Sequence, residues 1–122
     1  MAKDQSRTEK FIIYHNPRCT KSRNACQLFD TKGIPFEVRE YLKDPPTAEE
    51  IKSLLQKLNL TAHQVIRTNE DIYKLNFKGK ELTNDQWIQV IVQNPILLER
   101  PIVVRGNMAV IARPIENLDV FF

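Results

Sequence analysis

The chain has 122 residues, 42% of them hydrophobic and 27% charged, which suits one domain with a single core. The net charge of +3 is small and the basic residues are interspersed with acidic ones, so we expect neither nucleic acid nor a membrane as a partner. No apolar run approaches the ~20 residues of a membrane span, and residues 1–10 lack the apolar stretch of a secretory signal. These features predict a cytoplasmic protein, which we expect to be a monomer.

The first half of the chain alternates between strand and helix patterns. Residues 1–10 have no apolar period and are expected to form a flexible arm. Residues 11–14 are an apolar run typical of a strand buried on both faces. A helical pattern then begins at Cys19 and ends at Gly33. Pro35–Leu42 predicts a second strand, parallel to the first because a helix connects the two.

The second half begins with helix signals and ends with a hairpin. Three capping-box patterns predict three successive helices, in an insertion of about residues 45–95: Thr47 with Glu50, Thr61 with Gln64, and Thr83 with Gln86. Residues 101–104 and 108–111 flank a Gly-Asn pair, which predicts a hairpin, and a final helix is expected near Pro114. The order predicts one α/β domain over residues 11–122, with a thioredoxin-like fold: a small mixed four-stranded sheet flanked by helices, with an all-helical insertion.

Cys19 is the strongest candidate for a reactive group. A thiol at a helix N-terminus faces unpaired amides and the positive end of the helix dipole, and both favour the thiolate. We expect the pKa of Cys19 to be lowered further by its basic neighbours and by one histidine: Arg18, Lys21, Arg23 and His15. Ser22 stands where a Cys-x-x-Cys protein keeps its resolving cysteine, which predicts a monothiol site. The Ser22 hydroxyl is expected either to donate to the thiolate or to cap the helix.

The remaining candidates are a second cysteine and three arginines. Seven helical residues separate Cys26 from Cys19 by about 10 Å, beyond the ~7 Å Cα limit for a disulfide, so we interpret Cys26 as a core residue. Three arginines lie beside prolines or at a helix end and would form an oxyanion site together with a thiolate: Arg67, Arg100 and Arg113. Each taken alone also fits an ordinary surface arginine. The histidines form no Cys/His cluster, so we expect no metal and no bound cofactor.

Residues 14–24, Tyr-His-Asn-Pro-Arg-Cys-Thr-Lys-Ser-Arg-Asn, resemble the active-site loop of the glutaredoxin-coupled arsenate reductase family. Later landmarks of that family follow in order: Tyr41-Leu42, Pro45-Pro46, Arg67, residues 94–97, residues 100–104 and Arg113-Pro114. The resemblance implies that Cys19 attacks arsenate and that Arg67, Arg100 and Arg113 hold the oxyanion. The supporting residues expected around Cys19 are His15, Asn16, Ser22 and Pro101, with Pro101 as a cis proline.

The resemblance favours reduction of arsenate to arsenite through a thiolate-arsenate adduct, with glutathione as co-substrate and glutaredoxin as the resolving partner. Two alternatives stay open: a glutathione-dependent reductase of another substrate, and a polymerase-binding stress regulator of the same fold. Such regulators typically use a Cys-x-x-Cys switch, and Ser22 occupies the second position here. The family's common Cys-Gly-Thr-Ser reads Cys-Thr-Lys-Ser in this chain, and Arg18 replaces a small residue. The extra positive charge should suit an anion.

Overall fold

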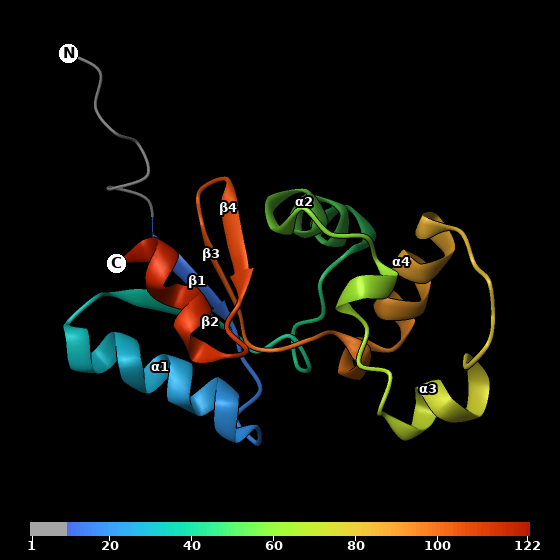
Figure 1. Ribbon diagram of the computed structural model, residues 1–122, viewed down its shortest axis with the longest axis horizontal. Helices are drawn as coiled ribbons and strands as arrows, with labels where there is room; N and C mark the ends of the chain where they lie inside the picture. Colours follow the sequence, from blue (N-terminus) through green and yellow to red (C-terminus); the bar gives the residue numbers. More distant parts are fainter. Residues whose placement is uncertain (1–9) are drawn as a thin grey trace, which may run out of the picture. The chain divides into compact units, whose positions relative to one another are not determined.

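The computed structural model describes residues 10–122, which form two compact units: residues 10–41 with Arg100–Phe122, and Leu42–Glu99 (Figure 1). The first unit contains four strands and two helices: β1 Phe11–Tyr14, α1 Thr20–Lys32, β2 Phe36–Arg39, β3 Ile102–Arg105, β4 Met108–Ile111 and the 3-10 helix η4 Ile115–Phe121. The second unit is helical: α2 Ala48–Leu58, η2 His63–Val65, α3 Asp71–Asn76, α4 Asn84–Gln93 and η3 Pro95–Leu97.

The sheet of the first unit has the strand order β2-β1-β3-β4. Strand β1 pairs in parallel with β2 and antiparallel with β3, and β3 pairs antiparallel with β4. This is the mixed four-stranded sheet of the predicted thioredoxin-like fold. The β3–β4 register pairs Arg105 with Met108, so Gly106 and Asn107 form the predicted turn, and Gly106 takes a positive φ of 59°. Strand β2 lies at the edge of the sheet. It covers four residues, fewer than the predicted Pro35–Leu42.

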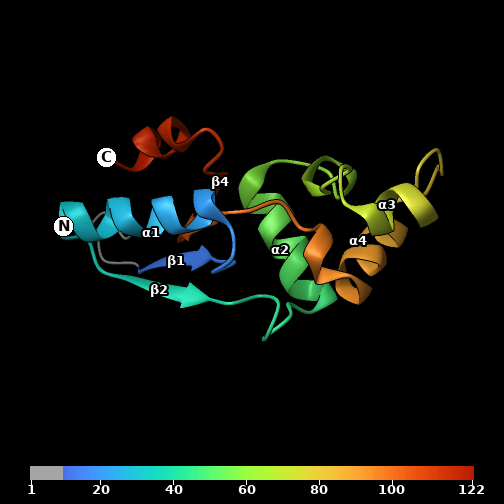
Figure 2. The same ribbon diagram turned by 90° about the horizontal axis from the view of Figure 1, so that it is seen from below.

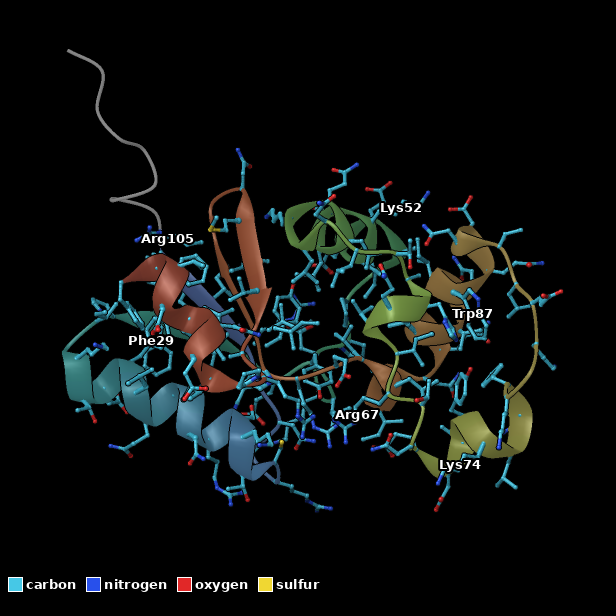
Figure 3. The ribbon with its side chains drawn as sticks, viewed as in Figure 1. Phe29, Lys52, Arg67, Lys74, Trp87 and Arg105 are labelled. Atoms are coloured by element: carbon cyan, nitrogen blue, oxygen red, sulfur yellow. The ribbon has the colours of Figure 1, made fainter. Side chains whose placement is uncertain are left out.

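Helices α1 and η4 both contribute to one core against the sheet (Figure 2). Phe29 of α1, labelled in Figure 3, is fully buried. Its ring meets that of Phe11 of β1 edge-on, with centroids 4.8 Å apart. Phe121 of η4 meets the same Phe11 ring at 5.2 Å. This apolar packing fixes α1 on β1, and it therefore fixes the loop that joins them. In residues 10–122, no helix combines the length and the apolar character needed to cross a membrane.

Two of the three predicted capping boxes start a helix in the second unit. Thr47 and Thr83 each accept the amide three residues on and are capped in return, at the starts of α2 and α4. At Thr61 only the three-residue helix η2 follows, because Ile66 then pairs with Leu98 in an isolated bridge. The prediction of a full helix there was wrong. The sequence also missed α3, and the helix expected near Pro114 is the 3-10 helix η4.

Candidate active site

Asn16 shapes the loop that joins β1 to α1. Its side chain is buried, and its Oδ1 accepts a hydrogen bond from the Arg18 amide at 3.0 Å. Its carbonyl oxygen accepts from the Cys19 amide at 2.9 Å, and its own amide donates to Ser22 Oγ at 3.0 Å. These contacts fold the loop into a tight turn and hold Cys19 at the N-cap of α1, with an extended backbone at φ −95° and ψ 121°. Cys19 therefore lies at the helix N-terminus, as the sequence predicted.

The surroundings of Cys19 favour its thiolate. Burial is the largest single effect and opposes ionisation. The Ser22 amide, the hydrogen-bonded guanidinium of Arg100 and the Lys21 amide outweigh burial, so the pKa of Cys19 lies below its usual value. The side chains proposed from the sequence, Arg18, Lys21, Arg23 and His15, are not among the groups that lower it. The cation that lowers the pKa of Cys19 is the guanidinium of Arg100, which directly precedes Pro101 at the start of β3.

Sheet register places Arg100 and Arg113 on neighbouring segments of the first unit. Ile102 pairs with Ile111, and the Ala112 amide donates to the Pro101 carbonyl at 2.9 Å, so the antiparallel register continues beyond the strands. When the same register is extended by one more residue on each segment, it places Arg100 opposite Arg113. Arg100 has buried Nε and Nη1 atoms, and Arg113 is half-buried. The Arg100–Pro101 bond is cis, as the resemblance implied, and so is Arg113–Pro114.

Ser22 and His15 form a part-buried contact beside the loop. Ser22 is fully buried, and its Oγ lies 2.6 Å from His15 Nδ1. Burial lowers the pKa of His15, with Glu40 opposing and Arg23 adding to the shift, so the ring is neutral near pH 7 and its Nδ1 can accept the serine hydrogen. The hydroxyl thus contacts His15 and the Asn16 amide, whereas Ser22 meets the thiolate through its backbone amide.

Cys26 lies about two helical turns beyond Cys19, and its Sγ is 3.7 Å from His15 Nδ1. It packs against the core of the first unit but is only half-buried, so the interpretation as a core residue holds in part. Burial raises the pKa of Cys26, and the charge of Asp30 raises it further. Near neutral pH this side chain is a thiol and a weak nucleophile.

Arg67 belongs to the second unit and is engaged with two carboxylates there. Its Nε lies 3.2 Å from Glu70 Oε2 and its Nη1 lies 3.3 Å from Glu99 Oε1, and the Arg67 side chain is 13% exposed. Its amide donates to the Leu97 carbonyl at 2.7 Å. The sequence reasoning missed both glutamates. Glu70 was recoverable from its i,i+3 spacing, but Glu99 depends on the pairing of Ile66 with Leu98.

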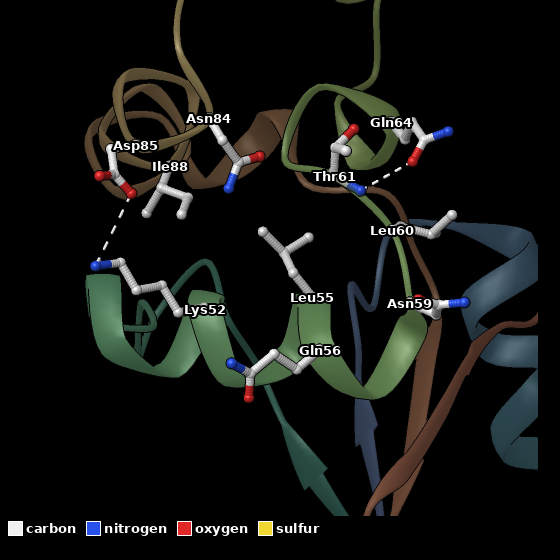
Figure 4. Close-up of a pocket in the computed structure, with 10 residues that line it drawn as sticks. All are labelled: Lys52, Leu55, Gln56, Asn59, Leu60, Thr61, Gln64, Asn84, Asp85 and Ile88. Atoms are coloured by element: carbon white, nitrogen blue, oxygen red, sulfur yellow. Dashed lines mark hydrogen bonds and ion pairs between the residues drawn. The ribbon is translucent and has the colours of Figure 1, made fainter.

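A cavity of about 480 Å³ lies between α2 and α4 of the second unit (Figure 4). Lys52 and Asp85 point toward one another across it, with Nζ and Oδ1 3.9 Å apart. Amide, hydroxyl and apolar side chains line the rest, and none of the predicted site residues is among its lining residues. Within residues 10–122, no group of three or more His, Cys, Asp or Glu side chains is placed to hold a metal ion.

Comparisons with known proteins show which family this chain resembles. The sequence model of the ArsC family matches residues 14–121. An arsenate reductase of Neisseria meningitidis is 43% identical over 109 residues, covering 88% of this chain and 93% of the relative. The uncharacterised protein YfgD of Escherichia coli is 42% identical over 113 residues, covering 91% and 95%. A solved structure of an arsenate reductase from Vibrio cholerae superposes with a TM-score of 0.87 at 37% identity, covering 93% of this chain and 98% of that one.

Proposed function

The chain belongs to the ArsC family, and we propose that it is an arsenate reductase whose nucleophile is Cys19. The observation that carries the proposal is the Cys19 thiol at the N-terminus of α1, with its pKa lowered by amides and by the guanidinium of Arg100. A thiolate and an oxyanion repel one another unless fixed cations offset their charges. Arg100 supplies such a cation directly at the sulfur.

In the first step, the Cys19 thiolate attacks arsenic and forms a sulfur–arsenic bond, while one arsenate oxygen takes up protons and leaves as water. Arg100, with Arg113 on the neighbouring segment, would hold the remaining oxygens through charge-assisted hydrogen bonds. The family resemblance adds Arg67. Its Nε and Nη1 contact carboxylates of its own unit, so its role toward the oxyanion rests on the resemblance.

In the second step, the glutathione thiolate attacks the Cys19 sulfur. A disulfide forms, the sulfur–arsenic bond breaks, and its electron pair stays on arsenic, which leaves as arsenite. A glutaredoxin thiolate then attacks the glutathione sulfur and releases the Cys19 thiolate. An external thiol is needed because position 22 is a buried serine, and because burial raises the pKa of Cys26.

The test is a coupled assay that contains glutathione, glutaredoxin, glutathione reductase and NADPH. We expect oxidation of NADPH that depends on arsenate, with arsenite as the product, and no turnover by Cys19→Ser. The Cys26→Ser variant is the matched thiol control and should stay active. Absence of arsenite formation by a folded wild-type protein would refute the proposed substrate.

A second candidate is a glutathione-dependent reductase of another substrate. The Arg18 and Lys21 side chains beside the thiol, where the family commonly has small residues, favour it. The same Cys19 chemistry would apply to another oxidised substrate. The coupled assay separates the two candidates. A reductase of another substrate would oxidise NADPH when that substrate is added and would not oxidise it when arsenate is added.

A further inference from the structure

Two exposed cations flank Cys19 along the chain. The Arg18 and Lys21 side chains are both exposed, and among residues 10–122 neither makes a hydrogen bond or an ion pair. Arg23 differs, because its Nη1 donates to the Pro17 carbonyl at 2.8 Å and its Nη2 to Thr20 Oγ1 at 3.2 Å. Arg23 therefore braces the loop, whereas Arg18 and Lys21 are available to a ligand.

The charge of this segment is of one sign. Residues 15–29 contain three basic residues and no carboxylate, and the first acidic residue of α1 is Asp30, near its far end. The helix N-terminus adds positive potential at Cys19. The side-chain charges of Arg18 and Lys21 are not among the groups that lower the Cys19 pKa; Lys21 contributes only its backbone amide. Both side chains are exposed, so both charges are accessible from solvent.

We propose that Arg18 and Lys21 bind the two carboxylates of glutathione and so determine the thiol donor of this enzyme. This inference rests on the proposed function, in which glutathione attacks the Cys19 sulfur. Glutathione carries one carboxylate at each end and its thiol in the middle, and this chain carries one exposed cation before Cys19 and one after it. The Arg18 Cα lies about 3.8 Å from that of Cys19 and the Lys21 Cα within about 7.6 Å, so both side chains reach the surroundings of the sulfur.

The two sets of cations then have separate ligands. Arg100 hydrogen-bonds to the Cys19 sulfur and offsets the charge of the thiolate and the oxyanion. Arg18 offers a planar guanidinium that matches a carboxylate with two parallel hydrogen bonds, and Lys21 offers a compact charge to the other carboxylate. Removal of Arg18 and Lys21 should therefore weaken reactions with glutathione and leave the thiolate itself unchanged.

The test follows mixed-disulfide formation at Cys19 without arsenate, by mass spectrometry of the intact protein. The Cys19 thiolate attacks one sulfur of an added disulfide, a new disulfide forms, and the other half leaves as a thiolate. The two probes are glutathione disulfide, which carries carboxylates, and 2-hydroxyethyl disulfide, which is neutral. The variant is Arg18→Gln with Lys21→Gln. The control is Lys74→Gln with Lys78→Gln, which removes two charges from exposed lysines of the second unit.

We expect the site variant to react with glutathione disulfide on the order of fivefold more slowly than wild type, and the control variant to match wild type. Reaction with the neutral disulfide should change less than about twofold, because it reports thiolate reactivity alone. Equal slowing with both probes would assign the two cations to thiolate activation and overturn the proposal. Unchanged rates with both would overturn it as well. Since arsenate is absent, the result is independent of whether arsenate is the substrate.

Discussion

Replacement of Arg67 separates a structural effect from a catalytic one. Its Nε and Nη1 contact different carboxylates, those of Glu70 and Glu99, whose side chains are 26% and 27% exposed. A buried hydrogen bond between charged groups contributes about 1.5–3 kcal/mol and an exposed ion pair about 0.2–1 kcal/mol, so about 1 kcal/mol per contact is appropriate here. Arg67→Lys keeps one contact and should lower the free energy of unfolding by about 1 kcal/mol, and Arg67→Met by about 2 kcal/mol.

Urea unfolding of three variants measures this effect: Arg67→Met, Glu99→Gln and the double variant. The cycle isolates the Arg67–Glu99 contact, for which we expect a coupling of about 1 kcal/mol. Lys74→Gln is the surface control and should stay within about ±0.5 kcal/mol of wild type. A coupling near zero, together with a wild-type midpoint for Arg67→Met, would refute the reasoning.

Kinetics of the same variants test the second role of Arg67. If the Arg67 guanidinium also holds arsenate, Arg67→Lys should lower kcat/KM for arsenate by more than its loss of stability accounts for. Glu99→Gln keeps the guanidinium and should lower stability while most of the kcat/KM remains. Equal kcat/KM in wild type and Arg67→Lys would show that Arg67 acts only through its ion pairs with Glu70 and Glu99.

Three further predictions concern the first unit. The rate of Cys19 alkylation by iodoacetamide should reach half its maximum at a pH below the ordinary thiol pKa of about 8.5, because the folded protein favours the thiolate. Arg100→Lys should move this midpoint upward, and a wild-type midpoint at or above the ordinary thiol pKa would contradict the site. Cys26→Ser should keep its turnover with arsenate, since burial raises the pKa of that thiol, and a folded but inactive variant would show a redox role. Ser22→Ala should lower the free energy of unfolding by about 1–3 kcal/mol, because it leaves the buried Asn16 amide without its acceptor, and an unchanged urea midpoint would oppose this role.

Local signals in the sequence predicted the elements that local contacts stabilise. The capping boxes at Thr47 and Thr83 start helices as expected, since both partners of each cap lie within one turn. Thr61 carries the same signal, but η2 ends where Ile66 pairs with Leu98. That bridge joins segments far apart in the chain, and no local pattern reports it. Tertiary pairing therefore ended a helix that the local sequence favoured.

The contrast between local and long-range contacts also explains which parts of the site could be predicted from the sequence. Cys19 was predicted because its position at a helix N-terminus is a local property. The cation that lowers its pKa was not predicted from neighbouring residues, because Arg100 reaches the sulfur from the entry to β3, the strand that pairs with β1. The exposed side chains of Arg18 and Lys21, although close to Cys19 in the chain, are not among the groups that lower its pKa. Nearness in sequence therefore predicted the right kind of charge at the thiol but assigned it to the wrong residues, because the pairing of β3 with β1 is a long-range contact.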